Sequence, residues 1–237
     1  MQIKKELLDV MKSFANVNGN IVLEKDSNFL RSKSPSADIY AWYKMGDDQD
    51  RFPVEFPIFE LNGFLSSLGL FNNPELNFTE NCLTIVDENG KSNMKSYAGF
   101  RDIVTGINDK DFKRLDPIVT FDLSNETLQN INKTASTMRV NDVGFIGDGE
   151  SILVKIANKV YEKNDGTNTY TMKIGETDKV FEVYHNVDAL KIIQTDYKYS
   201  VCSVNGHVLV MLESTNMPNE AVLYYYLTPN DVSSIKG

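Results

Sequence analysis

The chain has 237 residues, of which 41% are hydrophobic, so a core can form and one large or two ordinary domains fit. It carries 24 Lys and Arg against 33 Asp and Glu, and the resulting net charge of -9 argues against a simple basic nucleic-acid-binding protein. The composition therefore allows DNA binding only if the basic residues are segregated onto one surface.

Apolar residues recur at helical spacing in the first segment and predict an amphipathic helix over residues 3–16. They are Ile3, Leu7, Val10, Met11 and Phe14. The opposite face carries Lys5 and Lys12, and Asn18-Gly19 ends the pattern. Short strands are expected at 21–24, 29–32 and 39–44, followed by an extended segment at 52–59.

A second helix is predicted over residues 59–71, and its outer face is small and uncharged. Strands are then expected at 76–79, 82–87 and 93–98. Asn89-Gly90 lies between the last two of these strands, and this pair strongly favours a two-residue hairpin turn.

The second half repeats this order. A strand at 118–123 leads into a helix at 125–137, for which Ser124 is the expected N-cap. Strands follow at 143–146, 152–159, 170–174 and 180–185, and a short helix carrying Lys191 is expected at 186–193. A hairpin at 199–204 and 207–213 turns on Asn205-Gly206, and 221–227 is the last expected strand.

The order helix, strands, helix, strands therefore occurs twice, which predicts two domains of one topology. We expect an N-terminal domain at 1–100, a charged linker at 101–116 and a C-terminal domain at 117–237. Three of the four predicted helices carry Lys on the face left over from the core. If those faces lie on one side of the sheets, the basic residues gather there and the acidic excess lies elsewhere.

The sequence offers no catalytic centre and no cofactor or metal site. No Walker A loop, G-x-S-x-G or H-E-x-x-H motif occurs. The two cysteines and two histidines lie singly in predicted strands, where they are expected to be structural. An acidic cluster at 47–50 lacks the spacing of a calcium loop. No apolar stretch is long enough for a membrane span and no signal peptide is present, so a cytosolic protein is expected.

Two segments of the first half resemble the sliding clamps of T-even-like bacteriophages. Residues 8–23, LDVMKSFANVNGNIVL, resemble the opening of that family, where a Leu-Leu-Lys-Asn-Phe-Ala-x-Ile-Asn pattern leads into the first strand. Residues 59–65, FELNGFL, resemble its Tyr-Asp-Leu-Asn-Gly-Phe-Leu segment. Residues 128–140 and 186–198 fall where the family has its third and fourth helices, whereas the linker and the C-terminus depart from the pattern.

The resemblance implies an α+β DNA-clamp fold with two similar domains per chain, in which helices line the inner face of antiparallel sheets. Such clamps are homotrimeric rings that hold DNA polymerase on double-stranded DNA without sequence preference, are opened by a clamp loader and are not enzymes. Phage clamps of this family also contact late-transcription factors. The place of action would be the cytoplasm of the infected host cell.

Sliding on DNA requires sparse, mobile cations that meet phosphates and read no bases. The residues expected to face DNA are Lys4, Lys5, Lys12, Lys133, Arg139 and Lys191. Of these, Lys12, Lys133 and Lys191 align with basic positions of the family helices, whereas the alternative for Lys4, Lys5 and Arg139 is a direction toward the rim or solvent.

Two protein-binding surfaces are also expected from the family. A pocket for the peptide tails of polymerase and clamp loader would be formed by Pro117, Ile118, Tyr224, Tyr226 and Pro229, although alternating strand residues of this set can equally belong to the core. Neighbouring subunits would join through exposed strand edges. The candidates are Met94, Tyr97, Phe100, Tyr170, Met172 and Ile174.

Two other classes of protein remain open at this point. An oligomeric structural phage protein of the virion or tail explains the strands and the acidity, but not the spaced amphipathic helices. A small hydrolase ranks third, because no nucleophile or metal constellation occurs.

Overall fold

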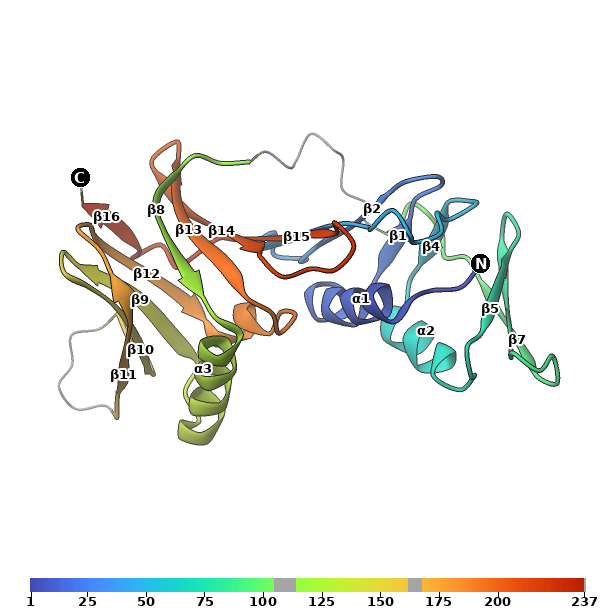
Figure 1. The fold of residues 1–237 in the computed structure, drawn as a ribbon, viewed down its shortest axis with the longest axis horizontal. Coiled ribbons are helices and arrows are strands. Elements are labelled where there is room, and N and C mark those ends of the chain that lie inside the picture. Colours follow the sequence, from blue (N-terminus) through green and yellow to red (C-terminus); the bar gives the residue numbers. More distant parts are fainter. Residues whose placement is uncertain (105–113, 162–167, 237) are drawn as a thin grey trace. The chain divides into compact units, whose positions relative to one another are not determined.

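The computed structural model describes residues 1–104, 114–161 and 168–236 (Figure 1). The chain forms two compact units, one of residues 1–113 and 217–224 and the other of residues 114–216 and 225–237. Residues 105–113 of the expected linker lie outside the described residues. Residues 217–224 group with the first unit, whereas the sequence pattern assigned them to the C-terminal domain.

The part of the first unit that the structure describes is built from two α-helices and antiparallel strands. Its elements are α1 (Lys5–Val17), β1 (Ile21–Leu23), β2 (Phe29–Lys33), β3 (Ile39–Lys44), β4 (Phe56–Ile58), α2 (Leu61–Leu68), β5 (Glu75–Phe78), β6 (Cys82–Val86) and β7 (Asn93–Tyr97). Strand β1 pairs with β4, β2 pairs with β3, and β5, β6 and β7 form a three-stranded sheet in that order. Every helix and strand expected in residues 1–98 is therefore present, with ends shifted by a few residues.

Helix α1 forms because its apolar residues make one continuous stripe. Leu7, Val10, Met11 and Phe14 are at most 1% exposed, and the stripe packs on β2, β3 and α2. Helices α1 and α2 lie side by side in Figure 1. The hydroxyl of Tyr43 in β3 donates a hydrogen bond of 2.5 Å to Glu6 Oε1, and burial is the main cause of a raised pKa of this tyrosine. Glu6 is thereby held toward the sheet.

In its described residues, the second unit contains one α-helix and two groups of antiparallel strands. Its elements are β8 (Pro117–Leu123), α3 (Asn125–Met138), β9 (Asp142–Asp148), β10 (Ser151–Ala157), β11 (Tyr170–Glu176), β12 (Val180–Asn186), the 3-10 turn η2 (Val187–Leu190), β13 (Tyr197–Val204), β14 (His207–Ser214) and β16 (Ser234–Lys236). Strand β15 (Val222–Leu227) begins in the first unit and ends in the second.

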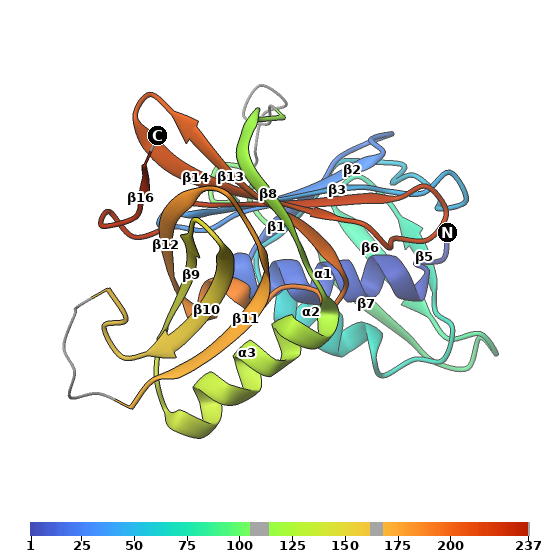
Figure 2. The same cartoon turned by 60° about the vertical axis from the view of Figure 1, so that its left-hand side comes forward.

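Strands β11, β10, β9, β12 and β16 form a five-stranded sheet in that order, and β13 pairs with both β8 and β14. Figure 2 shows α3 beside this five-stranded sheet, and the helix packs on β10 and η2. Rings from both strand groups meet in the core, where Tyr199 of β13 lies 4.7 Å from Phe121 of β8 and 4.6 Å from Phe145 of β9 between ring centroids.

One expected helix is wrong. The segment at 186–193 forms only the short 3-10 turn η2. The side chain of Asn186 accepts from the backbone N–H of Asp188, and the N–H of Lys191 bonds to the carbonyl of Asp188, which is the tighter i to i+3 pattern. Leu190 and Ile192 are both buried, so the chain leaves helical spacing immediately after the turn.

The expected N-cap of the third helix is confirmed. The hydroxyl of Ser124 accepts a hydrogen bond of 3.1 Å from the backbone N–H of Thr127 at the start of α3. Replacing Ser124 with alanine should lower the free energy of unfolding by about 1 kcal/mol, because a helix N–H loses its acceptor. Chemical denaturation measures this change. Ser136→Ala, at an exposed position of the same helix, is the matched control, and an equal loss there would contradict the cap.

Candidate nucleic-acid interface

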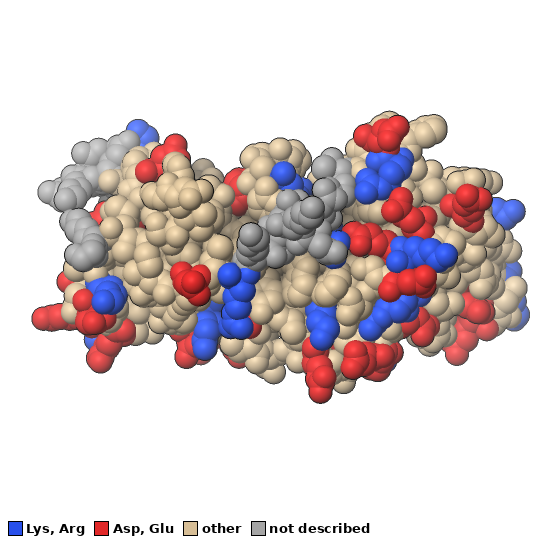
Figure 3. Space-filling model, turned by 90° about the horizontal axis from the view of Figure 1, so that it is seen from above, with Lys and Arg blue, Asp and Glu red and all other residues tan. Residues whose placement is uncertain are grey.

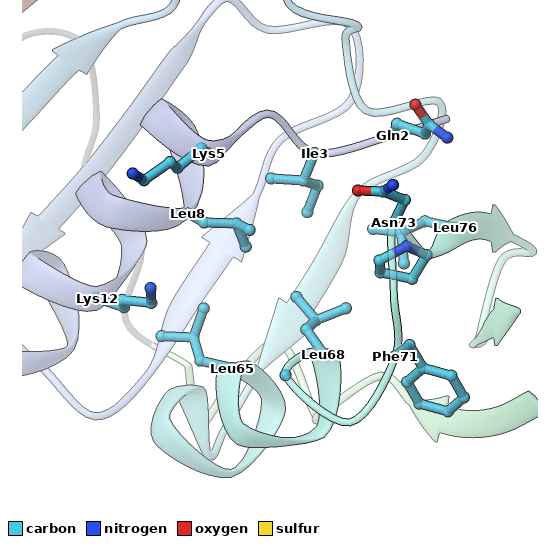
Figure 4. A pocket seen from close by; sticks show the side chains of 12 residues that line it. Gln2, Ile3, Lys5, Leu8, Lys12, Leu65, Leu68, Phe71, Asn73 and Leu76 are labelled. Carbon is cyan, nitrogen blue, oxygen red and sulfur yellow. The ribbon is translucent and has the colours of Figure 1, made fainter. Parts of the chain in front are cut away.

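Lys5 and Lys12 lie along the same side of α1, where they line a hollow between α1 and α2 with a volume of about 300 Å³. Figure 4 shows Leu65 and Leu68 rising from α2 toward Leu8 of α1. The ammonium of Lys12 is 3.3 Å from Asp9 Oδ1, and both side chains are about half or more exposed. Such an exposed pair leaves the lysine available to other anions.

Lys4 is placed differently from its two neighbours. It is the N-cap residue of α1, and its ammonium forms an ion pair with Asp48 in the loop after β3. The hydrogen bond from Lys4 is the main reason that the pKa of Asp48 lies below its usual value. Asp48 also accepts from Asn219 at 3.1 Å. The structure therefore directs Lys4 toward this acidic loop.

Helix α2 presents a neutral outer face. None of its eight residues is charged, and the hydroxyls of Ser66 and Ser67 donate to helix carbonyls one turn earlier, at 2.8 Å and 2.9 Å. These side chains stay short and satisfied within their own helix. The face can lie close to a polyanion without attracting or repelling it.

In the second unit, Arg139 and Lys191 line one hollow of about 240 Å³ at the end of α3, beside η2. Arg139 adopts a left-handed conformation, with φ at 56°, and its N–H bonds back to carbonyls of the last helical turn. The ammonium of Lys191 is 2.8 Å from Asp188 Oδ1. Lys133 is exposed, six residues before Arg139 on the same helix.

Sequence reasoning missed Asn132 in the same hollow. Its amide nitrogen donates to the carbonyls of Leu128 and Leu190 at 3.1 Å and 3.3 Å, and thereby ties α3 to η2. Its Oδ1 is buried and has no hydrogen-bond partner among the described residues. The contact with Leu128, which lies four residues earlier in the same predicted helix, could be expected from the sequence. The contact with Leu190 depends on tertiary structure.

Over the face shown in Figure 3, Lys and Arg side chains lie interspersed with Asp and Glu side chains. Several charges are paired locally, as in the contact of 3.2 Å between Arg101 and Glu55. On this face the acids and bases therefore alternate, in contrast to the simple segregation suggested by the composition.

The five residues expected to form a partner-peptide pocket fall into both units. Tyr224 belongs to the first unit, and its ring lies 5.5 Å from that of Trp42. Pro117, Ile118, Tyr226 and Pro229 belong to the second unit. Ile118 is 44% exposed, whereas Pro229 is buried. Burial, with Glu213 as the next cause, raises the pKa of Tyr226 to about 12.

The expected interface residues lie at two sheet edges. Strand β7 is an edge of the three-stranded sheet, and Tyr97 and, just beyond the strand, Phe100 are 72% and 80% exposed. Strand β11 is an edge of the five-stranded sheet. Tyr170 and Met172 are half-buried there, because both contact Asn130 of α3. Met94 and Ile174 are half-buried as well.

No group of three or more His, Cys, Asp or Glu in the described parts of the chain could hold a metal ion. None of the helices that the structure describes is long and apolar enough to cross a membrane.

No protein-family model matches the chain. A curated protein named sliding clamp from Vibrio phage KVP40 is 28% identical over 205 residues, which cover 85% of this chain and 90% of the relative. A second one, from Escherichia phage RB69, is 21% identical over 221 residues, which cover 92% and 94%.

Solved structures of PCNA proteins and of a β clamp share this fold. The PCNA2–PCNA3 complex of Sulfolobus tokodaii matches with a TM-score of 0.66 and 13% identity over 95% of this chain and 96% of the other. Archaeal PCNA from A. fulgidus, solved with the C-terminal region of FEN-1, has a TM-score of 0.67 at 13% identity and covers 94% of each chain. The H. pylori β clamp has a TM-score of 0.67 at 13% identity over 97% of this chain and 65% of that chain. The expected DNA-clamp fold is confirmed, and along nearly all of its length the chain is similar to the sliding clamps of these two bacteriophages.

Proposed function

We propose that this sliding clamp encircles duplex DNA as a homotrimeric ring and tethers the replicative DNA polymerase during processive synthesis. The observation that carries the proposal is the surface of the helices. Helices α1 and α3 bury their apolar stripes and leave Lys5, Lys12 and Lys133 exposed, while the intervening α2 is neutral. Few, long and flexible cations on a neutral background suit a surface that must attract phosphates and still slide.

Ring assembly is proposed to use the edges β7 and β11 of successive subunits. Among the described residues, each of these strands is the outermost strand of its sheet. The outer edge of such a strand has backbone groups that can pair with a strand of another subunit. Head-to-tail joining of two different edges makes a heterologous contact, which closes only at a fixed rotation per subunit. Because α3 covers Tyr170 and Met172, the backbone of β11 would supply this contact more than those side chains.

The proposal gives the chain no catalytic role. Ring opening would be done by a separate clamp loader, and short peptide tails of loader and polymerase would bind near Ile118 and Tyr226. Late-transcription factors are proposed as further partners, and the place of action as the cytoplasm of the infected host. A virion or tail protein is the disfavoured alternative, because the curated relatives are named sliding clamps.

Primer extension on a long single-stranded template tests the proposal, with the cognate polymerase and clamp loader and with or without this protein. We expect longer products only when protein, loader and ATP are all present. Sedimentation should show a discrete species of three chains of 26.8 kDa each. Unchanged product length would overturn the function, and a stable monomer or an open polymer would overturn the ring.

Removing the proposed DNA-facing charges should weaken DNA binding without sequence preference. For Lys12→Gln/Lys133→Gln, the plot of log affinity against log salt should become shallower by about 0.9 for each phosphate that the protein no longer neutralises. Fluorescence anisotropy with labelled duplexes of two unrelated sequences measures this slope. Lys91→Gln/Lys179→Gln removes two exposed lysines from strand turns and is the matched control. Equal slopes for the two double variants would show that Lys12 and Lys133 do not contact DNA phosphates.

A further inference from the structure

The hollow between α1 and α2 is lined by both apolar and basic side chains, and duplex DNA can contact only the basic ones. Its walls are mostly apolar, with Ile3, Leu8, Leu65 and Leu68 among the lining residues, and Lys5 and Lys12 also line it. Phosphates can contact the two ammonium groups, but the DNA backbone has no apolar side chain to enter between the leucines. A ligand that satisfies the whole hollow needs both an apolar group and negative charge.

We propose that this hollow, which we call the α1–α2 groove, binds a short acidic peptide segment with a large apolar anchor. The anchor would lie between Leu8, Leu65 and Leu68, and carboxylates on each side would pair with Lys5 and Lys12. The inference deepens the proposed function, because both lysines are also proposed to face DNA. A bound peptide and duplex DNA would therefore exclude each other at this groove.

The spacing of the two lysines sets the spacing of the acids. Lys5 and Lys12 are seven residues apart, which is about two turns or roughly 10 Å along the helix. In an extended peptide, side chains alternate between two faces, so residues four positions apart share a face and span roughly 13 Å, a distance that the long Lys and Glu side chains can accommodate. The motif that fits is therefore two acids four residues apart, with a large apolar residue midway between them on the same face, as in Glu-Ser-Leu-Ser-Glu.

The volume and the charges both favour this occupant. About 300 Å³ is at the small end of ligand pockets, so the groove accommodates an anchor rather than a whole folded partner. Lys12 is paired with Asp9 of its own helix, at 3.3 Å and with both side chains exposed, so a peptide carboxylate can replace that contact at small cost.

The test is fluorescence anisotropy of the intact protein with a labelled peptide that carries the Glu-Ser-Leu-Ser-Glu core, without DNA, polymerase or loader. We expect saturable binding that weakens at least tenfold when Gln replaces both Glu, and equally when Ser replaces the Leu. If either altered peptide binds as tightly as the original, the groove recognises charge alone or apolar surface alone, and the proposal is overturned.

Protein variants locate the binding site. Lys5→Gln/Lys12→Gln should weaken binding at least tenfold, whereas Lys25→Gln/Lys91→Gln, which removes two other exposed lysines of the same unit, should leave it unchanged. Leu65→Asn should abolish binding and Leu65→Met should retain it, with circular dichroism melts to confirm folding. Equal affinities across these variants overturn the proposal. Because no DNA synthesis is measured, failure here is distinct from failure in primer extension.

Discussion

Replacing Gly147 with alanine should lower the free energy of unfolding by about 2–3 kcal/mol, the largest effect expected of an added methyl group among the glycines that the structure describes. Gly147 of β9 lies opposite Phe181 of β12. An added Cβ would lie 2.4 Å from a ring carbon of Phe181 and 2.7 Å from the backbone oxygen of Lys179. The ring is 1% exposed and the oxygen belongs to the backbone, so neither can move without repacking the sheet.

Gly175→Ala in the same sheet is the control for this prediction. A Cβ at Gly175 would meet Ile152 at 3.5 Å, which is ordinary van der Waals contact. Alanine also restricts the unfolded chain, so this change should be neutral or stabilising by up to about 1 kcal/mol. Chemical denaturation of both variants and the parent measures the difference. Similar values for the two would show that the Phe181 ring does not close over β9 as described.

The sequence predicted most elements because their local signals agree with the packing. Three such signals are the apolar stripe of α1, the Ser124 cap of α3 and the Asn205-Gly206 turn. Within each of them, the residues that interact are close together in the sequence. Signals of that range need no tertiary contact to be interpreted. The short strand β16 was missed, because three residues paired with β12 carry no periodic pattern.

The candidate interface was less accessible to sequence reasoning. The exposed lysines of α1 and α3 follow from the helical period, but the direction of Lys4 depends on Asp48, forty-four residues away. The grouping of Arg139 with Lys191 depends on η2 packing beside α3, and the α1–α2 groove depends on two helices meeting. Each of these features depends on contacts between segments that are distant in the sequence. A single sequence therefore predicts which residues are exposed, but not which residues they contact in space.

A second large effect should appear when the pH is lowered. His185 is 2% exposed, and its Nε2 lies 2.7 Å from the hydroxyl of Tyr199. Burial lowers the pKa of His185 to about 3. In the unfolded chain the pKa is about 6.5, so between these two values the unfolded state binds more protons than the folded state. Stability must therefore fall as the pH drops below about 6.5.

The expected loss from this histidine is about 2 kcal/mol between pH 7.5 and pH 5, a window above the range in which ordinary carboxylates titrate. Denaturation curves at a fixed protein concentration measure it, because ring assembly makes apparent stability depend on concentration. His207→Gln, at the exposed end of a hairpin, should keep the full pH dependence. A parent protein equally stable at both pH values would contradict the buried neutral imidazole.

The double variant His185→Phe/Tyr199→Phe separates the effect of His185 protonation on stability from the effect of its packing in the core. His185→Phe alone would leave the Tyr199 hydroxyl buried without its partner, a cost of about 1–3 kcal/mol at every pH. Replacing both residues removes donor and acceptor together, and both rings remain available to pack among Phe121 and Phe145. This variant should lose the pH dependence between 7.5 and 5 and still fold. If it keeps that dependence, the titrating group is not His185, and the acid sensitivity of the second unit arises elsewhere in the chain.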